Sequence, residues 1–179
     1  MKHQTLNQRK VVWLLLVMLV VMFSACASLD SKNWKCRMAA VEKLTDQALL
    51  AKIAKEDKSW YVRKTAVEKL TDQALLANIA MEGKNLDVRK AAVEKLTDQP
   101  LLAKIAMEDN VWDVRRDAVY KLTDQKLLAN IALKGKDLEI RLAAIEKLTD
   151  QKLLAIISKD GTDLDTRKKA FQKLTTIVQ

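Results

Sequence analysis

Residues 87–103 read Asp-Val-Arg-Lys-Ala-Ala-Val-Glu-Lys-Leu-Thr-Asp-Gln-Pro-Leu-Leu-Ala, and close copies of this segment recur at a fixed interval of 26 residues. The phrase Lys-Leu-Thr-Asp-Gln occurs five times, first from Lys43 and last from Lys147, and no insertion breaks its register. A period of this length indicates one supersecondary unit copied in tandem. One arginine marks the same position of every copy: Arg37, Arg63, Arg89, Arg115, Arg141 and Arg167.

Each unit carries two segments in which apolar residues have helical spacing. In residues 60–85, one apolar stripe runs from Val62 to Leu70 and a second runs from Leu75 to Ala80. Apolar side chains at every third or fourth position predict an amphipathic helix for each segment. The whole chain has only three Gly and one Pro, which leaves little room for hairpins. We therefore expect each unit to be a pair of α-helices.

Residues at the predicted helix ends agree with this spacing. The second helix is expected to begin at Thr-Asp-Gln, and Pro100 fits its first turn, where no amide hydrogen is needed. Gly83, Gly135 and Gly161 follow the second helix, where a left-handed residue often ends a helix. Val111 interrupts a column of capping residues before the first helix, so that helix is expected to fray. The other members of the column are Asn33, Ser59, Asn85, Asp137 and Asp163.

A single unit is too small to fold alone. Ordering its backbone costs more free energy than burying its own side chains supplies, so units must stack and share one core. The sequence therefore predicts an all-α fold over residues 33–179, a right-handed α-solenoid of about five 26-residue helix-pair repeats. The pattern degrades after Ala170, where Phe171 replaces Val, so we expect a C-terminal half-repeat that acts as a cap.

The segment from Asp87 to Val93, followed by Leu96 to Gln99 and Leu101 to Ala103, resembles the α-solenoid repeats grouped as HEAT-like and the variant leucine-rich (LRV-type) repeats. This resemblance covers residues 33–179 and implies a helix-pair fold with the second helices on the concave surface. It also implies a second helix that is partly 3₁₀, as in the variant repeats, and a role in protein–protein interaction. Some relatives are chromophore lyases or DNA-repair enzymes, and some carry an iron–sulfur cysteine cluster, but their motifs are absent here.

The resemblance also implies a role for two identical columns. In HEAT-like proteins an arginine–aspartate ladder links adjacent units, so the arginine column is expected to pair with the aspartate of Thr-Asp-Gln. These residues are interpreted as structural, because partner binding would not require the same residue in every copy. The expected aspartates are Asp46, Asp72, Asp98, Asp124 and Asp150.

Columns that vary between copies are the better candidates for partner binding. On the second helix, Lys104 lies three residues before Met107, so both share a helix face away from the Leu/Ile stripe. Apolar side chains between amines would form an adaptable surface for a peptide or a partner helix. Alternatively, the Met and Leu side chains complete the packing between units. The candidate residues are Lys52, Asn78, Met81, Lys104, Met107, Asn130 and Leu133.

Two further columns have a structural and a functional interpretation. The lysines that begin Lys-Leu-Thr-Asp-Gln alternate with glutamates, so a solvated mixed-charge face is favoured over a site for an anionic partner such as lipid headgroups. Trp34, Trp60 and Trp112 share a column with leucines. They are interpreted as loop anchors in the core and not as a ligand platform.

The N-terminus has the pattern of a targeting signal. A basic stretch ending at Lys10 precedes an uncharged apolar run from Val11 to Phe23. A helix of this length rises only about 20 Å, short of the roughly 30 Å hydrocarbon layer. A signal peptide over residues 1–25 is therefore expected.

Phe23-Ser24-Ala25-Cys26 resembles the lipobox of bacterial lipoproteins. This resemblance implies cleavage before Cys26, lipidation of its thiol by diacylglycerol, often acylation of its new amino group, and a lipidated tether over residues 26–32. Ala27 after the cysteine implies anchoring to an outer membrane. Cleavage after Ala27 and an uncleaved anchor are the alternatives. If Cys26 is not lipidated, a disulfide to Cys36 becomes possible; otherwise Cys36 is expected to be a small buried hydrophobe or, alternatively, a reactive thiol.

The composition disfavours catalysis and nucleic-acid binding. The only histidine, His3, lies in the predicted signal peptide, so the mature domain lacks the usual general base. No catalytic residue, metal-ligand cluster or cofactor motif is identified, and basic residues alternate with acids. The expected function is a membrane-anchored, non-enzymatic scaffold that binds a protein or peptide partner. The alternatives are a structural spacer lipoprotein and a HEAT-like lyase-type enzyme.

Overall fold

The computed structural model describes residues 11–13 and 28–178. The predicted lipidation residue, Cys26, and most of the predicted signal peptide lie outside the described residues. Residues 28–178 form eleven helices and no strand. The first helices of the units are α2 (Trp34–Val41), α4 (Trp60–Lys69), α6 (Leu86–Lys95), α8 (Trp112–Lys121), α10 (Leu138–Lys147) and α12 (Leu164–Val178). The second helices are α3 (Gln47–Glu56), α5 (Gln73–Glu82), α7 (Gln99–Glu108), α9 (Gln125–Lys134) and α11 (Gln151–Asp160).

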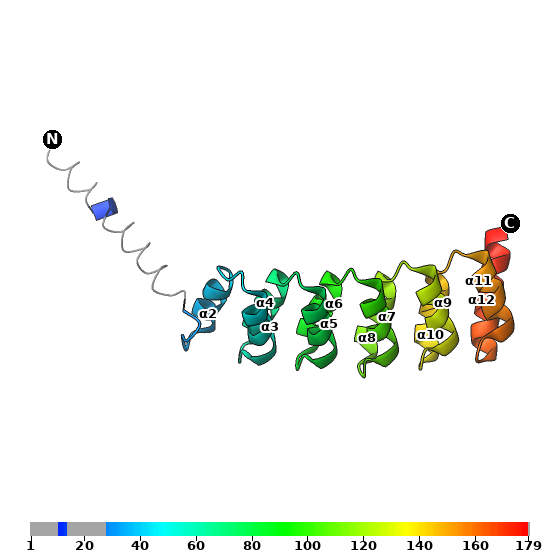
Figure 1. The fold of residues 1–179 in the computed structure, drawn as a ribbon, viewed down its shortest axis with the longest axis horizontal. Helices are drawn as coiled ribbons and strands as arrows, with labels where there is room; N and C mark the ends of the chain where they lie inside the picture. Colours follow the sequence, from blue (N-terminus) through cyan, green and yellow to red (C-terminus); the bar gives the residue numbers. More distant parts are fainter. Residues whose placement is uncertain (1–10, 14–27, 179) are drawn as a thin grey trace.

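The helices stack in chain order along one axis (Figure 1). Each first helix contacts the next first helix, from α2 to α12, and each second helix contacts the next second helix, from α3 to α11. The predicted all-α solenoid of helix-pair repeats is therefore confirmed. It presents two long surfaces, one built by the first helices and one by the second helices.

The closest packing within the solenoid joins each second helix to the first helix of the following unit. These packed pairs are α3 with α4, α5 with α6, α7 with α8, α9 with α10, and α11 with α12. Helix α12 thus completes the last pair and ends the row with 15 residues, whereas the other first helices have 8 or 10. At the opposite end, α2 packs mainly on α4.

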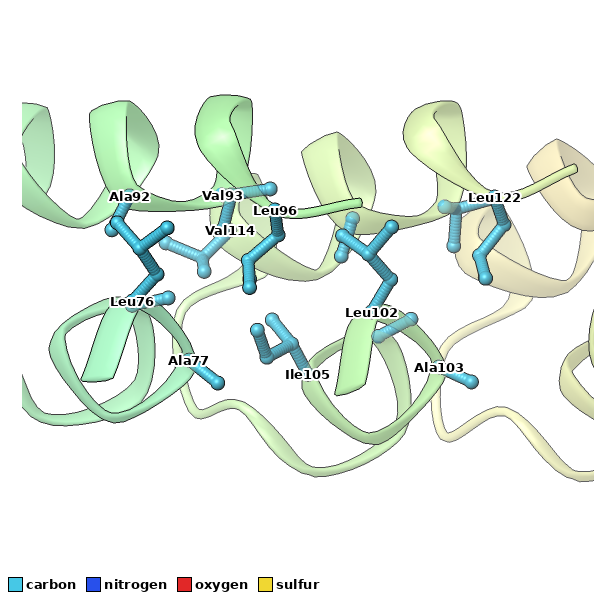
Figure 2. Packing of buried hydrophobic residues seen from close by; sticks show 14 of the residues in the cluster. Leu76, Ala77, Ala92, Val93, Leu96, Leu102, Ala103, Ile105, Val114 and Leu122 are labelled. Carbon is cyan, nitrogen blue, oxygen red and sulfur yellow. The ribbon is translucent and has the colours of Figure 1, made fainter. Parts of the chain in front are cut away.

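The buried residues form one continuous aliphatic core. Leu76, Ile79, Val93 and Leu96 have no exposed surface, and their equivalents one unit later are also fully buried. Figure 2 shows Leu76, Val93 and Leu96 beside Leu102 and Ile105 of the next second helix. Ala92 is fully buried too, and its small side chain allows the helices to approach closely. Cys36 is 8% exposed and occupies the column of Val62, so this position is buried as expected. The residue is disulfide-bonded and is not a lone thiol.

The geometry and the ends of the helices differ from the predictions in three respects. The second helices are α-helical throughout, so the expected 3₁₀ geometry is not observed. The left-handed prediction for the three glycines is wrong: Gly83 has φ −60° and ψ 136°, and no described residue has a positive φ. The chain instead leaves the second helix in an extended conformation toward the next first helix. Val111 lacks a side-chain cap as predicted, but Ser59 and Asp137 also make no capping bond.

Candidate functional site

The glutamine of Lys-Leu-Thr-Asp-Gln links each unit to the next. Gln73 Oε1 accepts hydrogen bonds from the backbone N–H of Thr97 at 2.7 Å, from the Thr97 hydroxyl at 3.2 Å and from the backbone N–H of Asp98 at 3.2 Å. Gln47, Gln99 and Gln125 make the same set of bonds. This role was not predicted from the sequence, although the identity of the glutamine in every copy was a signal for it.

The lysine of the same phrase bonds to the preceding unit. Lys69 Nζ donates to the backbone carbonyl of Glu42 at 2.7 Å, at the C-terminal end of α2. A cation is favourable there because the C-terminal end of a helix carries partial negative charge. Lys95, Lys121, Lys147 and Lys173 make the equivalent bond. These lysines therefore connect neighbouring first helices on a solvent-exposed face, a role that was not predicted from the sequence.

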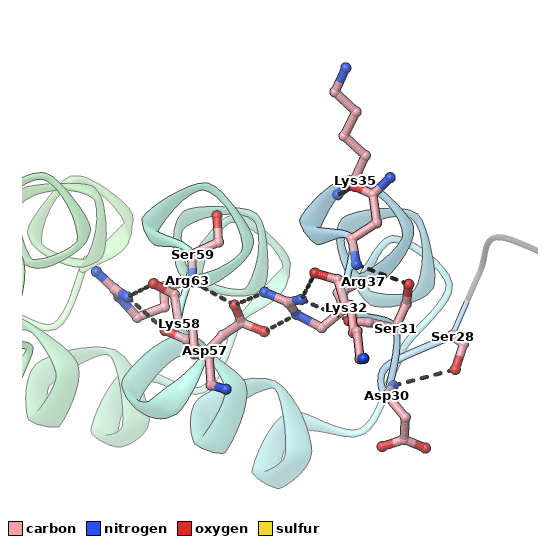
Figure 3. A network of polar contacts seen from close by, with 11 residues as sticks. Ser28, Asp30, Ser31, Lys32, Lys35, Arg37, Asp57, Lys58, Ser59 and Arg63 are labelled. Carbon is pink, nitrogen blue, oxygen red and sulfur yellow. Dashed lines mark hydrogen bonds and ion pairs between the residues drawn. The ribbon is translucent and has the colours of Figure 1, made fainter.

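The predicted arginine–aspartate ladder exists, but its aspartates are different ones. Arg37 Nε donates to Asp57 Oδ2 at 2.8 Å and its second terminal nitrogen to Asp57 Oδ1 at 2.9 Å (Figure 3). Arg89 pairs with Asp109, Arg115 with Asp137 and Arg141 with Asp163. The predicted partners Asp46, Asp72, Asp98, Asp124 and Asp150 instead cap the second helices, each accepting a backbone N–H bond in the first turn.

The ladder uses two alternative positions for its carboxylate. Asp57 and Asp109 lie 20 residues after their arginines, whereas Asp137 and Asp163 lie 22 residues after theirs. Where the later position is used, the earlier one is a glycine, Gly135 or Gly161. The loop between units therefore supplies one carboxylate to each of these arginines, from a residue either 20 or 22 positions after it.

Among the ladder arginines that are followed by another unit, Arg63 is the one without a carboxylate partner in the described residues. The two positions that could supply its carboxylate are occupied by Gly83 and Asn85. Arg63 donates to the carbonyls of Asp57 at 2.6 Å and Lys58 at 3.4 Å. Its Nε atom, however, is buried without a hydrogen-bond partner. One junction in the solenoid is thus electrostatically incomplete.

Burial and pairing shift the pKa of ladder groups. Burial alone would raise the pKa of Asp57, but the hydrogen bond from Arg37 and one from the backbone of Ser59 lower it below its usual value. The same Asp57 hydrogen bond raises the pKa of Arg37. Hydrogen bonds from Thr166, with the nearby Arg141 charge, lower the pKa of Asp163. These carboxylates are held ionised as structural links.

The candidate partner-binding columns lie along the row of second helices, where they divide by burial. Lys52, Lys104 and Asn130 are exposed, as is Ile156, which continues their column on α11. Asn78 is half-buried. The apolar candidates Met81, Met107 and Leu133 are half-buried and pack against the core. Their packing role is therefore real, and the exposed side chains among the candidates are those of Lys52, Lys104 and Asn130.

Lys55 and Glu82 connect neighbouring second helices on this side of the solenoid. Lys55 Nζ lies 3.1 Å from Glu82 Oε2. Hydrogen bonds from Lys55 and from Asn78 lower the pKa of Glu82. The face thus carries both charges, with amines at α3 and α7 and an ion pair between α3 and α5.

A shallow groove lies on the other surface, across the first helices α4, α6 and α8. Its walls include the aromatic rings of Trp60 and Tyr120, on either side of the small Ala91. Its charged lining includes Lys90 and Asp117, whose side chains are 3.2 Å apart. This groove was not predicted, because its lining residues come from the first helices of three different units.

The tryptophan column lies nearer the surface than predicted. Trp34 is half-buried and packs against the core. Trp112 is 38% exposed, and Leu86 and Leu164 in the same column are 41% and 69% exposed. Arg116 covers the Trp112 ring at 4.6 Å from its centroid. The interpretation as buried loop anchors is therefore wrong for Trp112.

Comparison with known proteins adds no relative from which a function could be transferred. No family model, curated protein or solved structure matches the chain. In the described part of the chain, no group of three or more His, Cys, Asp or Glu side chains could hold a metal ion. Among the described helices, none combines the length and the apolar character that crossing a membrane requires.

Proposed function

We propose that this chain is a lipid-anchored α-solenoid of the HEAT-like or variant leucine-rich type that works as a non-enzymatic scaffold for a protein or peptide partner. The observation that carries the proposal is that the residues linking the units and the exposed residues of the second helices are different sets. The polar residues of the repeated phrase are engaged in helix caps and in bonds between units. On the second helices, one exposed column differs between copies, with Lys52, Lys104, Asn130 and Ile156 at its exposed positions.

A row of second helices with varied exposed side chains suits recognition of an extended partner. Repeat solenoids offer broad side surfaces, and binding there needs no enclosed cleft. The exposed amines of Lys52 and Lys104 alternate with Asn78 and Asn130 along the row, which favours a partner with acidic groups at matching intervals. The half-buried Met81 and Met107 add adaptable apolar contact beside them.

The proposed anchor rests on the sequence of residues 1–32. Residues 1–25 are the proposed signal peptide, Cys26 the lipidated residue, residues 26–32 the tether and residues 33–179 the solenoid. Export and anchoring to the outer membrane would hold the scaffold at a bilayer surface. Two or more acyl chains give essentially permanent membrane binding, whereas one chain binds reversibly. Mass spectrometry of the N-terminal peptide tests this part, because the acyl chains add a defined mass to Cys26.

Two other functions remain as alternatives. A passive spacer would need only the stacked core and would have no specific partner. A lyase-type enzyme, as among some HEAT-like proteins, would need a cleft with a reactive group. We favour the scaffold because the exposed column that contains Lys52, Lys104 and Asn130 varies, while the Lys-Leu-Thr-Asp-Gln phrase that links the units does not.

The test is affinity capture from the native membrane with paired charge reversals. The variant Lys52→Glu with Lys104→Glu changes only exposed side chains of the second-helix row and should lose the partner. The control Lys64→Glu with Lys168→Glu makes the same charge change on exposed side chains of the first helices and should retain it. Loss of the partner only with the control would instead assign binding to the first-helix surface. Absence of any partner for the unaltered protein would favour the spacer.

A further inference from the structure

The first two units differ from the others at the residue pair that begins the first helix. Near the N-terminus this pair is Trp34-Lys35 in α2 and Trp60-Tyr61 in α4. In the later units an apolar residue is followed by an acid at the same two positions. These later pairs are Leu86-Asp87, Trp112-Asp113, Leu138-Glu139 and Leu164-Asp165.

The side chains of the first two pairs form one aromatic cluster with a lysine. The Tyr61 ring stacks on Trp34, with centroids 4.9 Å apart, and on Trp60, with centroids 3.9 Å apart. Lys35 Nζ lies 5.7 Å from the centroid of the Trp34 ring. Tyr61 is 47% exposed and Lys35 is exposed, so the cluster is open to solvent. Figure 3 shows Lys35 pointing away from the Arg37–Asp57 bonds.

Positive charge is concentrated in the same part of the chain. Residues 28–64 contain nine Lys and Arg against five Asp and Glu, a net charge of +4. Residues 65–179 contain 20 Lys and Arg against 18 Asp and Glu, a net charge of +2 over three times the length. The units bearing the aromatic cluster are therefore basic, and the rest of the solenoid is close to neutral.

This combination suits the surface of an anionic bilayer. Trp and Tyr rings favour the membrane–water interface because they join an apolar body to a polar edge. Each lysine near an anionic surface favours the bound state by about fivefold. The acids at the equivalent positions of the later units would be repelled by the same surface. The N-terminal end of the rod is thus suited to contact anionic lipid, whereas the later units are not.

The position of the cluster in the chain agrees with this partner. Trp34 is eight residues from Cys26, a span of at most about 27 Å of extended chain. Trp112 lies three units further along the rod, at about 10 Å for each stacked helix. A lipid on Cys26 would therefore hold the first cluster, but not Trp112, close to the bilayer.

We propose that Trp34, Lys35, Trp60 and Tyr61 form a membrane-docking end that seats the N-terminal units of the solenoid on anionic lipid. This inference rests on the lipid anchor proposed above. Docking at one end gives the rod a defined orientation, with the later units projecting away from the bilayer toward a partner.

The test uses the full chain, purified as the lipoprotein and reconstituted in vesicles of phosphatidylcholine and phosphatidylglycerol with brominated acyl chains. These chains quench tryptophan fluorescence only near the bilayer. One reporter keeps Trp34 and Trp60 and carries Trp13→Phe and Trp112→Phe. The second keeps Trp112 alone and carries Trp13→Phe, Trp34→Phe and Trp60→Phe. We expect strong quenching of the first reporter, weak quenching of the second, and less quenching of the first at high salt.

A variant separates docking from anchoring. Lys35→Asp with Tyr61→Asp, made in the first reporter, gives the two N-terminal units the acid that later units already carry at this position, so the fold should tolerate it. It should float with the vesicles but lose most of the quenching. The control Lys136→Asp with Lys126→Gln makes the same net change of charge on exposed side chains far from the cluster and should quench normally.

Each outcome decides between the two proposals. If the chain floats with the vesicles but the Trp34 and Trp60 reporter is quenched no more than the Trp112 reporter, docking is refuted and the anchor stands. Undiminished quenching in the Lys35→Asp, Tyr61→Asp variant also refutes docking by this cluster. A chain that does not float refutes the anchor and docking together.

Discussion

Gln73 and Thr97 occupy neighbouring units, and the Gln73 side-chain oxygen accepts the Thr97 backbone N–H over 2.7 Å. The same oxygen accepts two further bonds from the start of the next second helix. A residue in one unit thus satisfies donors that would otherwise be open at a helix N-terminus of the next unit. The repeated phrase is in this sense a linker between units as well as a helix start.

Removing this link should destabilise the solenoid by a modest amount. We expect Gln73→Ala to lower the free energy of unfolding by about 1 kcal/mol, because the bonds are exposed and water replaces part of them. Gln151→Ala is the matched control: in the described residues, Gln151 makes no such bond, since α12 continues where a Thr-Asp-Gln turn would lie. Urea unfolding followed by circular dichroism measures both. Equal losses for the two variants would argue against the link.

The ladder pair Arg89–Asp109 should be worth more. Both side chains are almost fully buried, so Arg89→Ala leaves the Asp109 carboxylate without its ion-pair partner. Breaking a buried pair in this way costs about 3 to 5 kcal/mol. The double variant Arg89→Ala, Asp109→Gly should recover part of the loss, because glycine is native at this position in three units. Thermal unfolding of the two variants checks the prediction, and a midpoint unchanged by Arg89→Ala would contradict it.

Supplying the missing carboxylate of Arg63 should stabilise the protein. Asp163 shows that an aspartate at this position can cap its helix with one oxygen and bond an arginine with the other. We therefore expect Asn85→Asp to keep its cap on Val88, pair with Arg63 and raise the free energy of unfolding by about 1 to 2 kcal/mol.

The control for this gain is Asn110→Asp, which makes the same chemical change in an exposed loop. It should leave the stability within about 0.5 kcal/mol of the unaltered protein. A gain of similar size in both variants would show that added negative charge, and not pairing with Arg63, is responsible.

Acid should weaken the ladder. The folded-state pKa of Asp57 lies below its usual value of about 3.9. Its bond to Arg37 therefore stabilises the fold above about pH 4, and this contribution is lost as the pH falls through the lower, folded-state pKa. Linkage therefore predicts that Asp57→Asn reduces the decrease in the free energy of unfolding between pH 5 and pH 2. Urea unfolding at each pH measures this decrease. An unaltered pH dependence in this variant would remove Asp57 from the explanation.

The helices and the core were predictable because they depend on a pattern that every copy repeats. Val62, Leu70, Leu76 and Ile79 are buried as the helical spacing requires. The pairing of the helices was harder to predict, because the repeat in the sequence suggests that the two helices of one copy pack together. Packing instead joins each second helix to the next copy, as α5 joins α6.

The partners of identical polar residues were harder to assign. An aspartate such as Asp72 suits both a helix cap and an arginine ladder, and only the positions of its oxygens distinguish the two. The true ladder residues were hidden because Asp57 and Asp137 belong to different columns that substitute for each other. Gly83 suggested a left-handed turn from residue type alone, while the backbone there is extended.

The sequence predicts which positions form the proposed binding face, but not which of their side chains are exposed. Lys104 and Met107 share a face of α7 as predicted, but their burial differs because the methionine reaches the core. The first-helix groove is lined by Trp60 of α4, Ala91 of α6 and Tyr120 of α8. These residues occupy different positions in their units, so comparing equivalent positions between copies does not reveal the groove.

Deletion of one complete unit tests most directly whether each copy is held only by its neighbours. Removing residues 86–111 joins Asn85 to Trp112, deletes Arg89 together with Asp109, and lets Gln73 meet Thr123 in place of Thr97. We expect this chain to unfold cooperatively with native helicity per residue and a lower thermal midpoint, as nearest-neighbour stacking requires. Deletion of residues 86–98 alone should be far more disruptive, because it removes a first helix and leaves its partner unpaired. If removing the complete unit abolished the fold as fully as removing the half unit, stacking of equivalent repeats would be contradicted.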